Sequence, residues 1–137
     1  MQPGVQIRHP DQLSGATPQS GSMQRLAAVS AETTGSQNLW MGRVTTPAGM
    51  VSAWHHHGDC ETGIYVVQGR ARFRWGAGGR ESAEVGAGDF LAVAPGAIHQ
   101  EETLGDEAVV LIVARSCSGI IVVNVDGPAP DRQGEPA

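Results

Sequence analysis

Histidine is concentrated at two places in the sequence, the run His55-His56-His57 and the single His99. Successive side chains of a β-strand point to opposite faces, so residues two apart share a face. His55 and His57 are therefore expected to project together, with Cα atoms about 6.6 Å apart, while His56 points the other way with Trp54. Two imidazoles at this separation can converge on one metal ion.

His99 is placed to supply a third imidazole. It follows the turn-forming segment Ala94-Pro95-Gly96, so a strand that begins near His99 can run beside the strand of the other two histidines. Three neutral ligands leave open positions on a metal ion for substrate or water, as a catalytic site requires. We therefore predict a divalent metal site at His55, His57 and His99. Imidazole suits several metals alike, so the ligand types alone do not select one.

The same residues lie in a pattern that resembles the two motifs of the cupin superfamily. The first motif, a glycine followed by His-x-His, a glutamate and a second glycine, is matched by Gly49, His55, His57 and Gly69. The second motif, a Gly-Asp strand start followed by Pro, Gly and His, is matched by Gly88-Asp89, Pro95-Gly96 and His99. The match runs in the correct order, and the two motifs together are a much stronger signal than either alone.

Within the superfamily the chain looks most like the small single-domain RmlC-like cupins, through the blocks Trp54–Gly58, Tyr65–Arg70 and Val122–Pro128. The resemblance implies an all-β double-stranded β-helix, a small jelly-roll barrel, that binds a divalent metal ion. Three-histidine cupins include Fe(II) dioxygenases, so it favours Fe(II) and a non-haem dioxygenase-like enzyme. Zn, Mn, Ni or Cu stay open as metals. A Lewis-acid isomerase, decarboxylase or hydrolase, or a non-enzymatic small-molecule-binding protein, stays open as the function.

Two acidic residues are candidates for the same site. By its spacing to Gly69, the metal-binding glutamate of the first cupin motif falls on Thr62, with Glu61 one residue early. A shift of one residue reverses the face of a strand residue. Glu61 therefore binds the metal only if the preceding loop bulges, and otherwise the site has three histidines. Glu101 shares the face of His99 two residues on and is a candidate general base, with a surface acidic patch as the alternative.

From Leu39 onward, short β-prone segments are separated by turn residues, and the chain contains 19 Gly and 8 Pro. The predicted strands are Leu39–Thr45, Val51–His57, Ile64–Val67, Ala71–Trp75, Phe90–Val93, Val109–Ala114 and Ile120–Val125. Only Met23–Ala31 has modest helical character. Strands that recur about every dozen residues are typical of a β-sandwich or barrel.

The length of 137 residues predicts one domain. We expect an extended N-terminal arm over residues 1–24, the barrel over 25–126 and a flexible C-terminal tail over 127–137. Exposed edge strands need covering, and cupins of this size are commonly dimers. A homodimer is therefore expected, with the arm and the Ile120–Val125 strand available to pair with a second subunit.

The charge and hydropathy of the chain exclude two classes of partner. Nine basic residues, all Arg, stand against fourteen acidic ones, for a net charge of −5, which argues against nucleic-acid binding. No apolar run approaches the roughly 20 residues of a membrane span, and no signal-peptide block is present, so no membrane association and a cytoplasmic location are expected. The expected partner is a small-molecule substrate. An anionic one would suit an ion that keeps its full +2 charge.

Three further features have a structural and a functional interpretation. Arg70, Arg72 and Arg74 alternate with apolar residues, so their face either recruits an anion inside the barrel or, as is more usual, is solvated or meets another subunit. Tyr65 is expected to pack between the sheets. With only two cysteines, a disulfide scaffold is not indicated, although one bridge can form, and Cys60 is interpreted as an ordinary loop cysteine.

Overall fold

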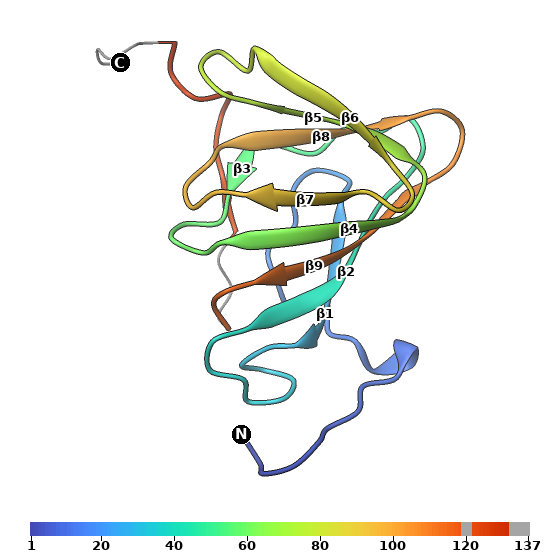
Figure 1. Cartoon of the computed structure of the whole chain (residues 1–137), viewed down its shortest axis with the longest axis vertical. Coiled ribbons are helices and arrows are strands. Elements are labelled where there is room, and N and C mark those ends of the chain that lie inside the picture. Colours follow the sequence, from blue (N-terminus) through green and yellow to red (C-terminus); the bar gives the residue numbers. More distant parts are fainter. Residues whose placement is uncertain (119–121, 132–137) are drawn as a thin grey trace.

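The computed structural model describes residues 1–118 and 122–131, and within them two five-stranded antiparallel sheets face each other to form a barrel (Figure 1). The strands are β1 (Gln24–Val29), β2 (Trp40–Thr46), β3 (His55–His56), β4 (Thr62–Gln68), β5 (Arg70–Trp75), β6 (Glu81–Gly86), β7 (Phe90–Val93), β8 (His99–Leu104), β9 (Val109–Arg115) and β10 (Val123–Asn124), preceded by the short 3-10 helix η1 (Pro10–Gln12). The strand orders are β1-β2-β9-β4-β7 and β10-β3-β8-β5-β6. The all-β barrel prediction is confirmed. Among the described residues, no helix has the length and apolar character needed to cross a membrane.

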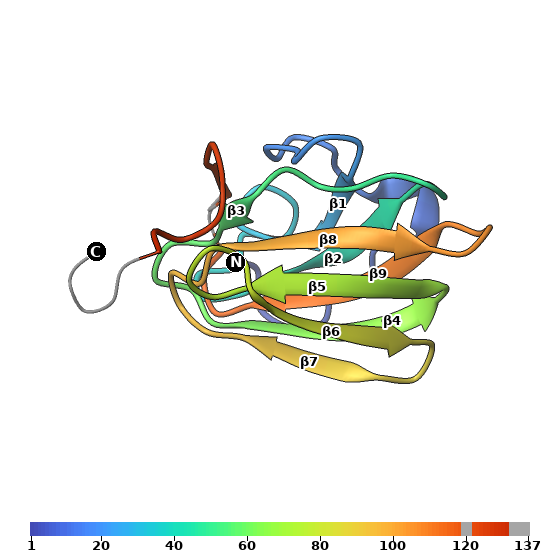
Figure 2. The ribbon, with the colours of Figure 1, turned by 90° about the horizontal axis from the view of Figure 1, so that it is seen from above.

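Alternating burial along the strands builds the core between the sheets. In β2 and β9 every second residue is buried, as expected for sheets with one face toward the interior. Figure 2, seen from above, shows β5, β6 and β8 running in roughly the same direction as β4 and β7 of the other sheet. The buried apolar cluster includes Trp40, Val44, Ile64, Val66, Phe73 and Leu111. Each of these large side chains stabilises the fold by about 1.5–3 kcal/mol through burial.

Two strands lie where the sequence does not predict them. The segment with helical character, Met23–Ala31, contains β1, which pairs antiparallel with β2. Arg25 and Ala27 are buried on the inner side of β1, and this burial outweighs a weak helix propensity. The helical interpretation is therefore wrong. The second unpredicted strand, β6, is polar and largely exposed, so it carries no apolar alternation to reveal it.

The N-terminal arm packs against the barrel of its own chain. Ser14 pairs with Ala27 in an isolated bridge, and Ser20 Oγ donates a hydrogen bond to Asn124 Oδ1 at 2.6 Å. Val123 and Asn124 form β10, which pairs with β3 of the same chain. Both segments expected to meet a second subunit are therefore used within the protomer. Of the predicted strand Ile120–Val125, residues 120 and 121 lie outside the described residues.

The first part of the predicted C-terminal tail is also anchored. Ala129 pairs with Ala77 in the turn between β5 and β6, and Arg80 forms an ion pair with Asp131. Residues 127–131 thus contact the barrel through a backbone pairing and an ion pair. Residues 132–137 lie outside the described residues.

A disulfide joins Cys60, in the loop before β4, to Cys117, just after β9, with Cα atoms 5.8 Å apart. The interpretation of Cys60 as an ordinary loop cysteine is therefore wrong. The bridge closes a sequence separation of 57 residues. A cross-link over this span reduces the conformational freedom of the unfolded chain.

Removing this bridge is expected to lower the free energy of unfolding by about 4 kcal/mol, the value the chain-entropy relation predicts for a loop of this length. The comparison is a urea titration of the oxidised protein against the Cys60→Ser/Cys117→Ser double variant. Thiol titration of the denatured, unreduced protein provides the control. Two reactive thiols in that sample would show that the bridge does not form.

Candidate metal centre

Strand pairing brings the three predicted histidines together. His55 on β3 lies directly opposite His99 on β8 in the antiparallel register, and His57 follows two residues after His55. All three side chains are buried, and their candidate ligand nitrogens lie within 4.8 Å of one another. The ring centroids are 4.3 Å apart for His55 and His99, and 5.2 and 5.3 Å for the pairs that include His57. His56 points away and is half-buried, as strand alternation predicts.

Backbone carbonyls set which nitrogen of His55 and His99 carries a proton. His55 Nδ1 lies 2.7 Å from the carbonyl oxygen of Ala53, and His99 Nδ1 lies 2.9 Å from that of Ala97. A carbonyl only accepts hydrogen bonds, so Nδ1 must be the protonated nitrogen of each ring. In the neutral form Nε2 then carries the lone pair. Both Nε2 atoms are buried and have no hydrogen-bond partner among the described residues.

Burial keeps these two imidazoles uncharged. Loss of hydration lowers the pKa of His55 to about 2, with further lowering by the nearby His99 and Arg25. Loss of hydration likewise lowers the pKa of His99 to about 4. Neutral imidazole is the form that binds metal ions. These two rings are therefore in the metal-binding form at neutral pH.

Of the two candidate carboxylates, only Glu101 enters the cluster. It is buried on the inner side of β8, and its Oε2 lies 3.6 Å from His55 Nε2 and 3.8 Å from His99 Nε2. Both distances exceed a hydrogen bond, and with both imidazoles neutral they are not ion pairs at neutral pH. Loss of hydration raises the pKa of Glu101 to about 7, although the Arg25 charge acts in the opposite direction.

Glu61 lies outside the cluster. Gly58, with a φ of 58°, lets the chain turn after His57, and β4 then begins at Thr62, which is buried. Because Thr62 faces the interior, its predecessor Glu61 is exposed and does not reach the histidines. Of the two arrangements that the sequence leaves open, the structure shows the one with three histidines.

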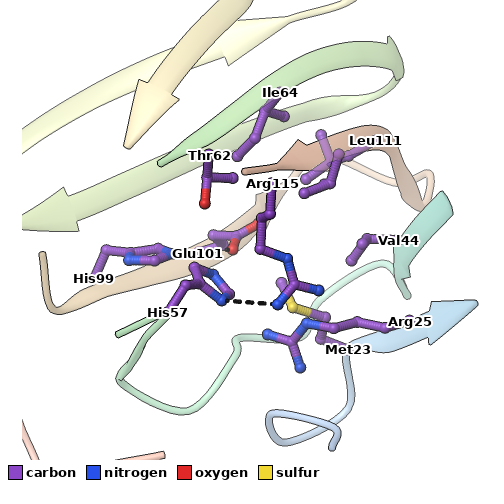
Figure 3. Close-up of a pocket in the computed structure, with 11 residues that line it drawn as sticks. Met23, Arg25, Val44, His57, Thr62, Ile64, His99, Glu101, Leu111 and Arg115 are labelled. Atoms are coloured by element: carbon purple, nitrogen blue, oxygen red, sulfur yellow. Dashed lines mark hydrogen bonds and ion pairs between the residues drawn. The ribbon is translucent and has the colours of Figure 1, made fainter. Parts of the chain in front are cut away.

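Two buried arginines line a cavity together with His57, His99 and Glu101. Sequence reasoning missed both arginines. Arg25 on β1 and Arg115 on β9 are 2% and 1% exposed. Figure 3 shows their guanidinium groups on the side of the cavity where His57 lies. Arg115 Nη1 is 3.4 Å from His57 Nδ1, and its guanidinium stacks 4.0 Å from the Trp40 ring centroid. A signal was present, since Arg115 shares the strand parity of Leu111 and Val113, both of which face the interior.

The arginines that the sequence did single out lie outside the barrel. Arg72 and Arg74 contact Glu102, and Arg70 and Arg72 contact Glu84, at 3.2–3.5 Å. These partly exposed pairs connect β5 to its neighbours β6 and β8. The anion-recruiting interpretation of this face is therefore wrong, and the solvated one holds.

His99 stands between two cavities of different character. The cavity shared with the arginines has a volume of about 10 Å³, which is roughly the space of one water-sized molecule. On another side His99 borders an apolar cavity of about 300 Å³ lined from β5, β6 and β7, including Phe73, Trp75 and Leu91. Because β6 and β7 are the end strands of the two sheets, this second cavity lies where the sheets do not pair.

Comparison with known proteins places this geometry in a family. A family model for the cupin domain matches residues 42–115, a segment that includes all three histidines. The chain belongs to the cupin family. No curated protein matches its sequence.

Solved cupin structures share the fold at low sequence identity. An oxalate decarboxylase variant from Bacillus subtilis superposes with a TM-score of 0.69 at 22% identity over 81% of this chain. The match covers 29% of the decarboxylase, so this cupin spans less than a third of that enzyme. A protein with a double-stranded β-helix domain from Klebsiella pneumoniae has a TM-score of 0.68 at 18% identity, over 90% of this chain and 99% of its own. An oxalate oxidase has a TM-score of 0.66 at 21% identity, over 85% of this chain and 64% of its own.

The lowered histidine pKa values predict that the metal-free protein loses stability in mild acid. The folded-state pKa of His99 is about 4, below the ordinary value of about 6.5, so the unfolded chain takes up a proton first as the pH falls. The His99 contribution is complete above pH 6.5, and about 3 kcal/mol of it is lost by pH 4. The raised pKa of Glu101 acts in the opposite direction over the same range. The His99 contribution is therefore measured as the difference between wild type and His99→Gln in urea titrations after chelator treatment. Equal pH slopes for the two proteins would contradict it.

Proposed function

We propose that this cupin is a metal-dependent enzyme that acts on a small molecule at His55, His57 and His99. The observation that carries the proposal is the pair of buried Nε2 lone pairs on His55 and His99, which have no hydrogen-bond partner among the residues that the structure describes. A buried acceptor without a partner costs about 1–3 kcal/mol, and a bound cation removes that cost. The donor set fits a divalent ion, since neutral imidazole suits Fe, Zn, Cu and Ni.

The three histidines would hold the ion and leave the rest of its coordination sphere to other ligands. An ion bound by neutral imidazoles keeps its +2 charge and can serve as a Lewis acid or, as Fe(II), support oxygen-dependent oxidation. We favour the Fe(II) dioxygenase version. The alternative is a Zn or Mn Lewis-acid enzyme. Two of the similar folds belong to an oxalate decarboxylase and an oxalate oxidase, which supports small-molecule chemistry at the metal but selects neither version.

Glu101 is proposed as the residue that moves a proton during the reaction. It lies in the same cavity as His57 and His99, and the main chain holds it in place, because Glu101 N–H donates to Ser52 Oγ at 2.9 Å. A carboxyl group beside the bound ligand can accept or return a proton at the reacting atom. Its sequence neighbour Glu102 faces outward and pairs with Arg72, so it provides a matched control.

A homodimer and a cytoplasmic location remain proposals. The outer face of the β1-β2-β9-β4-β7 sheet exposes apolar side chains, including Met41, Tyr65, Val67 and Phe90, and such a face is typical of a subunit contact. Tyr65 packs on Phe90 there, with ring centroids 4.8 Å apart, so it does not pack between the sheets as expected.

The disulfide weighs against a reducing compartment, so the location should be tested through the redox state of the cysteines in cells.

Metal binding should depend on the clustered histidines and not on their neighbour. Elemental analysis of anaerobically purified protein is expected to show one divalent ion per chain. The variants His55→Ala, His57→Ala and His99→Ala should each lose it, because each removes one of three ligands. His56→Ala, whose side chain faces away, should keep it. A His99→Ala variant that retains the full metal content would contradict the proposed site.

The reaction class is tested by turnover with and without oxygen. Small carboxylic acids, including oxalate, are screened by oxygen uptake and by product analysis under argon. We expect oxygen uptake with bound iron, whereas product formation under argon would select the Lewis-acid version. Glu101→Gln should lower kcat by about 10²–10⁴-fold with little loss of metal, and Glu102→Gln should leave kcat unchanged. Equal rates for the two variants would remove Glu101 from the mechanism.

A further inference from the structure

The cavity beside the histidines contains hydrogen-bond donors as well as lone pairs without partners. Arg25 Nη2 and Thr62 Oγ1 are both buried and have no hydrogen-bond partner among the described residues. They line the same cavity as His57, His99 and Glu101, and Figure 3 shows the Thr62 hydroxyl turned into it. The lone pairs fit a cation and the donors fit an anion.

One terminal nitrogen of the Arg25 guanidinium group is hydrogen-bonded, and the other has no partner among the described residues. Nη1 donates to the carbonyl oxygen of Pro18 at 2.9 Å, which ties the N-terminal arm to β1. No acidic side chain among the described residues lies within 4.0 Å of Arg25, unlike Arg70, Arg72 and Arg80, which pair with Glu84, Glu102 or Asp131. A buried guanidinium with an unused donor is costly unless an anion accepts from it.

The surplus charge in the cavity is positive. Arg25 and Arg115 both line it, and Glu101 is the only acidic side chain among the described residues that does. A divalent ion on the histidines would add to this excess. An anionic ligand would offset it.

We infer that Arg25 binds the carboxylate group of the ligand that this site takes, next to the metal position. The inference rests on the proposed function and names the chemical class of its substrate, a small carboxylic acid. A planar carboxylate is an acceptor that matches the donor geometry of a guanidinium group. Thr62 Oγ1 supplies a second donor from β4.

The test compares two ligands that differ in charge and hardly in size, glycolate and glycolamide. Their dissociation constants are measured by calorimetry on the full chain loaded with Zn(II), and again after chelator treatment. Wild type is expected to prefer glycolate by at least 10-fold. Arg25→Gln should reduce this preference to about 2-fold or less, and Arg25→Lys, which keeps the charge but not the fork, should lie between the two. Arg43→Gln is the matched control, because Arg43 lies on the neighbouring strand β2 and does not line the cavity.

The outcomes distinguish a failure of the proposed function from a failure of the inference about Arg25. A protein that binds neither Zn(II) nor Fe(II) refutes the proposed function, and the measurement after chelator treatment still tests Arg25 on its own. If Zn(II) binds but wild type shows no preference for glycolate, the inference is wrong whatever the variants do. It is also wrong if folded Arg25→Gln keeps the full preference. Thermal unfolding of each variant separates this loss from damage to the arm that Arg25 anchors through Pro18.

Discussion

The site depends on the cost of placing ionisable groups in the buried interior of the barrel. Desolvation holds His55 and His99 in the neutral form, and it raises the pKa of Glu101 to about 7. The two backbone carbonyls that accept from Nδ1 leave the Nε2 lone pairs facing one another. A bound cation would provide a partner for both lone pairs, which have none among the described residues. The same desolvation makes the Arg25 and Arg115 charges expensive and favours an anion beside them.

The scaffold positions these groups through long-range pairing and one covalent link. His55 and His99 meet because β3 and β8 are adjacent and in register, although the residues are 44 positions apart. The ends of the neighbouring segments are tied by the Cys60–Cys117 bridge. Its two ends lie three residues after His57 and two residues after Arg115. The covalent link therefore restrains both the histidine loop and the end of the strand that carries the second guanidinium.

Much of the site could be predicted from the sequence because strand alternation determines which neighbours share a face. That rule groups His55 with His57 and His99 with Glu101, and it separates Glu61 from Thr62. It does not say which face points inward, and for this reason Tyr65 was expected inside although Ile64 and Val66 take the interior. The disulfide and the inward position of Arg25 depend on contacts between distant segments. Arginine is usually a surface residue. The residue type therefore did not indicate that Arg25 is buried, although its position on β1 faces the interior.

The departure from the cupin motif at Thr62 agrees with the charges around it. A glutamate at this inward position would bring a second carboxylate into the cavity that Arg25 and Arg115 line, and it would offset one of their charges or that of the metal. Thr62 contributes only a neutral hydroxyl, so Glu101 is the one acidic group among the described residues that lines the cavity. An ion on three neutral imidazoles would keep its whole charge beside two guanidinium groups. The carboxylate that the chain does not provide from β4 is therefore the group that its ligand is expected to bring.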